Sequence, residues 1–123
     1  MTQSKDTIGD GQQLKLITAI VQRGKADKPV RAALDAGAPA ASIFFARGQG
    51  IRERLGLLGL AIQPEKEVIL IVLEKRLLNQ VLVAMIKAGN LDQPGVGFVF
   101  VTPVEFAVGH VLATELLGSG SPD

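Results

Sequence analysis

The sequence predicts an α+β fold in which two β-α-β units build a four-stranded antiparallel sheet with two helices on one face. Two observations lead to this fold class. Strand-like apolar runs alternate with helix-like runs in the order β-α-β, twice. The 123 residues are also enough for one domain with its own core, and nothing in the sequence calls for a second.

The first β-α-β unit is expected to begin at residues 14–21, a β-rich run with apolar side chains at both odd and even positions. A strand with two apolar faces is typical of the centre of a sheet. A helix follows, with Asp27 as its N-cap, Pro29 in its first turn and Gly37 at its end. A second strand at 42–46 completes the unit. The apolar positions of the helix are Val30, Ala33 and Leu34.

The second unit begins with a strongly β-branched strand at 67–73. A helix follows and is expected to stop at Gly89 and Asn90, residues that favour helix C-termini. The fourth strand is expected at 97–101, and Pro103 indicates that the chain there leaves the sheet or lies at its edge. The apolar stripe of the second helix is Leu77, Leu78, Val81, Leu82, Met85 and Ile86.

This order matches the split β-α-β, or ferredoxin-like, arrangement, in which two right-handed crossovers place both helices on the same face of the sheet. Since the first and third strands are apolar on both sides, the other face would be apolar and exposed to water. Soluble proteins avoid large apolar surfaces of this kind. We therefore expect the chain to oligomerise through its sheet.

Composition excludes several classes of function. A net charge of +1 and an aromatic content of 4% provide neither the basic surface nor the stacking residues of a nucleic-acid-binding protein. The chain has no Cys, which excludes disulfides, thiolate metal sites and a cysteine nucleophile. Its longest apolar run, 68–73, is too short to span a membrane. Residues 1–13 read as a flexible leader without a secretory signal, 14–112 as the domain and 113–123 as a tail. A cytoplasmic location is expected.

Six short segments carry a resemblance to a known family. They are 15–25, 30–34, 48–50, 84–88, 95–101 and 103–105. In their order and spacing, over roughly residues 14 to 110, they resemble the PII signal-transduction proteins, which are ferredoxin-like homotrimers. The resemblance implies nucleotide sites in the clefts between subunits. It also implies that residues 47–66 form the signalling loop, or T-loop, that docks onto a membrane transporter or an enzyme.

The resemblance assigns ligand-binding positions residue by residue. Ser42 matches a hydroxyl position near the adenine, and the glycines at the ligand match Gly48, Gly50, Gly95 and Gly97. A glycine lets the backbone approach a ligand closely and present N–H donors to an anion. The implied ligand is a small anionic metabolite, an adenine nucleotide such as AMP, ADP or ATP.

Other positions depart from the family. Phe98 stands where the family has a phosphate-binding Lys, and Gly109 and Val111 stand where it has two arginines. Arg52 replaces a Gln that helps hold Mg-ATP and 2-oxoglutarate, and without Tyr the loop cannot be uridylylated. The chain therefore resembles a divergent PII-like protein, with most of the triphosphate clamp missing, more than a nitrogen sensor of the usual kind.

Three arginines lie beside the glycine pair Gly48 and Gly50. Arg47, Arg52 and Arg54 are able to hold a phosphate or carboxylate through charge-assisted bonds. The alternative is that they are solvated or form weak ion pairs with nearby glutamates. The motif is neither a complete dinucleotide fingerprint nor a phosphate-binding P-loop.

The following segment has an apolar stripe at helical spacing. Its residues are Ile51, Leu55, Leu58 and Ile62. Gly56 and Gly59 weaken such a helix by about 1 kcal/mol each, so we expect these residues, with Arg54, to order on a partner protein. The alternative is that residues 57–62 extend the third strand into a long hairpin.

The only histidine, His110, lies near the missing phosphate-binding arginines, where it is either a pH-dependent anion contact or a structural or exposed residue. No nucleophile and base, metal set or pair of carboxylates indicates an enzyme. The leading hypothesis is a trimeric PII-like regulator that binds an anionic metabolite. The alternative is an interaction module that binds a partner through residues 47–66 without any small ligand.

Overall fold

The computed structural model describes residues 13–48 and 65–109. The expected leader except Gln13, most of the 47–66 segment and the expected C-terminal tail lie outside these ranges. Six elements follow one another along the described chain. They are β1 (Leu14–Gln22), α1 (Asp27–Asp35), β2 (Ser42–Arg47), β3 (Glu65–Glu74), α3 (Lys75–Gly89) and β4 (Gly97–Val104).

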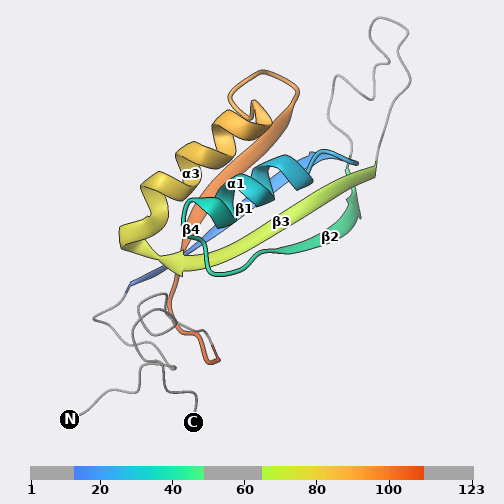
Figure 1. The fold of residues 1–123 in the computed structure, drawn as a ribbon. Coiled ribbons are helices and arrows are strands. Elements are labelled where there is room, and N and C mark those ends of the chain that lie inside the picture. The colour runs from blue at the N-terminus through green and yellow to red at the C-terminus, as the bar shows by residue number, and fades with distance from the viewer. Residues whose placement is uncertain (1–12, 49–64, 110–123) are drawn as a thin grey trace, which may run out of the picture.

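The four strands form one antiparallel sheet in the order β2-β3-β1-β4. Both helices lie on the same face of this sheet (Figure 1). This confirms the predicted fold class and the central place of the first strand. Pro103 lies inside β4, opposite Lys15 of β1, and is tolerated because β4 is an edge strand.

The core lies between the sheet and the helices, on what we call the covered face. Alternation along the two central strands directs one set of side chains toward α3. The buried residues of this set are Ile17, Ala19, Val21, Ile69, Ile71 and Leu73, with Leu77, Val81 and Met85 from α3. The shorter α1 packs chiefly against α3 and buries Pro29 and Ala33, whereas Leu34, expected in its apolar stripe, is exposed.

The opposite side of the sheet, the open face, carries no helix (Figure 1). The register of the strands places its side chains in rows that cross all four strands. One row is Phe44, Val68, Ile20 and Phe98, and the next is Ser42, Leu70, Thr18 and Phe100. Most of these side chains are apolar. Val68 and Thr18 are buried, but Phe44, Phe98 and Phe100 are exposed, so the single chain has the exposed apolar surface that the sequence predicts on this face.

The start of α1 differs from the sequence prediction. Asp27 is the first helical residue and Ala26 is the N-cap, with no side-chain cap of its own. The Ala26 N–H instead donates a hydrogen bond of 3.0 Å to Oε1 of Glu67 on β3. The expectation for Asp27 was wrong because a carboxylate from the sheet, distant in sequence, takes the capping role. The end of α3 is as predicted, with Asn90 in the left-handed conformation at φ 53°.

Candidate functional site

The edge strand β2 carries the first group of expected ligand residues. Ser42 is its first residue, on the open face, and Gly48 directly follows its last residue, Arg47. At roughly 3.3 Å per residue, Ser42 and Gly48 are about 20 Å apart along the strand. They therefore mark opposite ends of β2.

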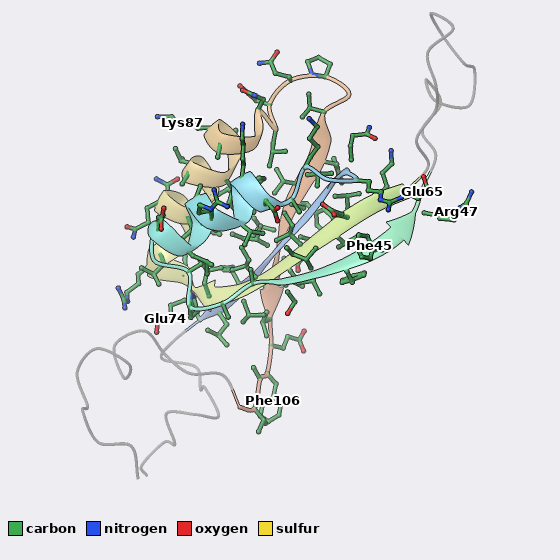
Figure 2. The ribbon with its side chains drawn as sticks, turned by 45° about the vertical axis from the view of Figure 1, so that its right-hand side comes forward. Phe45, Arg47, Glu65, Glu74, Lys87 and Phe106 are labelled. Carbon is green, nitrogen blue, oxygen red and sulfur yellow. The ribbon has the colours of Figure 1, made fainter. Side chains whose placement is uncertain are left out.

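Arg47 and Glu65 face each other across the β2–β3 pair, at the point where both strands meet the 47–66 segment. Figure 2 labels both side chains at this end of the sheet. The Arg47 side chain is exposed and Glu65 is half-buried. The paired backbone positions of Arg47 and Glu65 hold the two ends of the segment side by side.

The second group of expected ligand residues lies at β4, where the two glycines have different structural reasons. Gly95 has φ +82°, and a Cβ there would have open space around it, so its backbone conformation favours glycine. At Gly97 a Cβ would lie 2.9 Å from the Ile20 carbonyl oxygen and 3.1 Å from Cδ2 of Leu91. Gly97 is thus needed for close packing against β1, apart from any contact with a ligand.

The two groups lie at opposite edges of one sheet. Between β2 and β4 run β3 and β1, so three strand spacings of about 4.8 Å, roughly 14 Å in all, separate them. A single chain does not bring them together around one small molecule. The other expected ligand and partner residues lie outside the described residues. These are Gly50, Ile51, Arg52, Arg54, Leu55, Leu58, Ile62 and His110.

A small pocket of about 180 Å³, the sheet-end pocket, opens beside the start of β4. Its polar groups are Gln22 and Lys66, whose Nζ donates a hydrogen bond of 3.4 Å to Oε1 of Gln22. Its apolar wall includes Ile20, Val96 and Phe98, and 62% of the Phe98 side chain is exposed. Gln22 and Lys66 could not be identified as neighbours from the sequence, because only the strand register places them opposite each other.

At the far end of the sheet, the buried carboxylate of Glu74 has a structural role. Its Oε1 lies 2.7 Å from Nε of Arg76, and the next residue, Lys75, donates its N–H to the Gln13 carbonyl at 2.9 Å. This joins the start of α3 to the start of β1. Within residues 13–48 and 65–109, no three His, Asp or Glu side chains gather into a group suited to a metal ion. Neither helix of the described chain is long and apolar enough to cross a membrane.

Comparisons with known proteins agree with this fold. A family model for nitrogen regulatory protein P-II matches residues 14–110. Among solved structures, the GlnK–ATP complex of B. subtilis is similar, with a TM-score of 0.59 and 19% sequence identity over 76% of this chain and 83% of that chain. No curated protein matches the sequence. The family resemblance and the fold expected from the sequence are both confirmed.

Proposed function

This chain belongs to the nitrogen regulatory protein P-II family, and on that premise we propose that it is a trimeric, non-enzymatic regulator. In this proposal each cleft between two subunits binds a small anionic metabolite, most suitably an adenine nucleotide. The bound ligand then sets the state of residues 47–66, which control a partner protein. We propose that the protein acts in the cytoplasm.

The observation that carries this proposal is the placement of the two ligand groups at opposite edges of the sheet. The β2 edge has Arg47 and Gly48, and the β4 edge has Gly95. A complete site requires the β2 edge of one copy beside the β4 edge of another. The apolar open face supplies a reason for copies to associate, because burying it removes apolar surface from water.

The proposed ligand has fewer phosphates than ATP. Phe98, where the resemblance expects a phosphate-binding lysine, offers the sheet-end pocket an aromatic surface and no charge. Lys66 remains as a cation at this pocket and Arg47 as one at the β2 edge. Two cations balance the charge of AMP or ADP more closely than that of a free triphosphate, which carries more negative charge. The similar structure from B. subtilis, described as an ATP complex, supports an adenine nucleotide as the class.

Residues 47–66 are the proposed signalling segment. Both of its ends are fixed to the sheet through the Arg47 and Glu65 positions, next to the proposed ligand edge. A ligand that contacts Arg47 in only one state of the segment would shift the population toward that state. The proposed partner is a membrane transporter or an enzyme, and the proposed contacts are Ile51, Arg54, Leu55, Leu58 and Ile62.

Calorimetric titration of the purified protein with AMP, ADP and ATP tests the ligand, with light scattering to establish the assembly. We expect a trimer that binds AMP or ADP more tightly than ATP. Phe98→Lys should restore a phosphate contact and raise ATP affinity about tenfold, since a charge-assisted bond contributes about 1.5–3 kcal/mol. Phe106→Lys adds the same charge at another exposed Phe and should change nothing. An intact trimer that binds none of the three nucleotides at millimolar concentration would refute a nucleotide regulator.

An interaction module without a small ligand is the second candidate, and one observation favours it. The sheet-end pocket is small and largely apolar, with Phe98 beside Ile20 and Val96. In that case Phe98 fills the cleft between subunits and residues 47–66 clasp the partner unaided. Native mass spectrometry of gently purified protein separates the candidates. A trimer with a co-purified nucleotide supports the first, whereas a bare trimer that still captures its partner supports the second.

A further inference from the structure

A larger cleft lies on the helix side of the same end of the sheet. We call it the α1 cleft. It measures about 680 Å³ and is enclosed by the loop after β1, the first turns of α1, the end of α3 and the residues before β4. Val21, Gln22, Gly95 and Val96 line both this cleft and the sheet-end pocket, so the two cavities share a wall that includes the expected ligand residue Gly95. In Figure 1 the segment between α3 and β4 arches over this end of the molecule.

The floor of the α1 cleft is apolar. Val21 and Leu91 line it and are both buried in the core. Gly89 also contributes to the lining, and a Cβ there would lie 3.0 Å from Cγ of Pro29, so the helices pack too closely at this position for a larger residue to project into the cleft. A volume of this size falls within the range of small-molecule sites, roughly 300–1,000 Å³.

The rim of the α1 cleft is cationic. Lys25 comes from the loop after β1, and Lys28 and Arg31 come from successive turns of α1. Residues three apart on a helix lie on the same side, so Lys28 and Arg31 are neighbours. Asp27 is the one carboxylate among the residues that line the cleft. In a chain with a net charge of +1, this rim is a local concentration of positive charge.

Two of the backbone positions at the start of α1 have no N–H available for an anion. The Ala26 N–H, which would otherwise point to an anion at the helix N-terminus, is already bonded to the Glu67 carboxylate. Pro29 has no N–H to donate. The side chains of Lys25, Lys28 and Arg31 are therefore the main groups that recognise an anion here. Arg31 in particular can form a bidentate pair with a phosphate or carboxylate.

We propose that the α1 cleft is a second ligand site, which binds a small organic anion. The phosphate or carboxylate of the anion lies at the rim formed by Lys25, Lys28 and Arg31. The apolar or ring portion lies on the floor at Val21 and Leu91. This site lies within one chain, so it needs no trimer. Its rim of Lys25, Lys28 and Arg31 is not part of the proposed nucleotide site, so variants at the rim test it apart from the proposed function.

The probes are phenyl phosphate, phenylacetate and inorganic phosphate, titrated into the full-length protein at constant ionic strength. Binding is followed by amide chemical shifts. We expect saturable shifts at Gly24, Arg31 and Leu91, with phenyl phosphate bound about tenfold more tightly than inorganic phosphate because its ring buries apolar surface. Phenylacetate distinguishes a carboxylate site from a phosphate site. Shifts that grow linearly without saturation, or that centre on Lys66 and Phe98, would overturn the proposal.

Charge reversal at the rim provides the matched test. Arg31→Glu keeps an exposed helix-forming residue on α1 and should weaken phenyl phosphate binding about tenfold or more. Lys75→Glu makes a comparable reversal at the first residue of α3, about 20 Å from the cleft at 1.5 Å per residue, and should leave binding unchanged. Equal losses of phenyl phosphate affinity in both variants would mean that the ligand is attracted by net charge alone, and would refute a site. If Arg31→Glu does not fold, Lys25→Gln with Lys28→Gln makes the same test without adding a carboxylate.

Discussion

The two faces of the sheet are built from similar residues but meet different surroundings. On β3, Ile69 points to the covered face and is completely buried, while its neighbour Leu70 points to the open face and is only half-buried. Both side chains are large and aliphatic. The difference shows that apolar residues in the sequence mark surfaces that become buried, whether they are buried by the same chain or by another one. Folding of one chain buries the covered face, whereas we propose that assembly with other copies buries the open face.

The largest expected effect comes from a charge on the open face. Phe100→Glu places a carboxylate in the row with Thr18 and Leu70, where the proposed assembly would remove it from water. We expect the trimer to be lost and light scattering to report the mass of one chain. Val83→Glu, on α3 and exposed to a similar extent, should remain a trimer. A Phe100→Glu protein that stays trimeric would rule out the open face as the interface.

A pair of neighbouring truncations compares the two faces directly. Ile69→Ala should lower the free energy of unfolding by about 2–5 kcal/mol, because it leaves a cavity in the core. Leu70→Ala should cost less at low protein concentration and more as concentration rises, because its side chain is buried only on assembly. Chemical denaturation at several concentrations measures both. Equal and concentration-independent losses would contradict the division of roles between the faces.

Glycines at the two edges give a smaller effect. Gly97→Ala should lower the free energy of unfolding by about 1–3 kcal/mol, because the new Cβ would press on the Ile20 carbonyl and Leu91. Gly48→Ala is the matched control, since its Cβ would meet only Cγ of Lys66 at an ordinary 3.8 Å. It should change stability by no more than about 0.5 kcal/mol. Thermal unfolding of both variants checks this, and a control as unstable as Gly97→Ala would show that packing is not the reason.

The smallest effect concerns the link between sheet and helix on the covered face. Glu67→Ala removes the acceptor of the Ala26 N–H and should lower the free energy of unfolding by about 1 kcal/mol. Hydrogen exchange of the Ala26 amide should accelerate. Glu65→Ala, two residues away on the same strand, should leave that amide as protected as before. Unchanged exchange in Glu67→Ala would mean that the carboxylate does not cap α1.

Local sequence patterns were sufficient to predict the helices and strands. The two apolar faces of residues 14–21 predicted a central strand, and Asn90 predicted the end of the second helix, because both signals depend on neighbouring residues. Asp27 shows where local patterns fail. It has the right chemistry for a cap, but Glu67, 41 residues from Ala26, is placed at the helix start by the fold. The spacing of Glu67 and Ala26 in the sequence does not indicate that they come into contact.

The candidate site was predictable only in part, for a similar reason. Gly95 could be named from its motif, and its positive φ gives a local reason for glycine. The pairing of Gln22 with Lys66 follows from the register of β1 and β3, which a single sequence does not specify in advance. The cationic rim of the α1 cleft was also missed, because it joins a loop, a helix and the end of another helix that meet only in the fold.

The placement of the expected ligand residues on β2 and β4 has a genetic consequence. In the proposed trimer each site is formed by the β2 edge of one copy and the β4 edge of its neighbour, so no copy contains a complete site. A variant disabled at the β2 edge and another disabled at the β4 edge would each be inactive as pure trimers. Mixed in the same cell, they would assemble trimers in which one intact β2 edge meets one intact β4 edge. Two defective alleles would therefore complement each other.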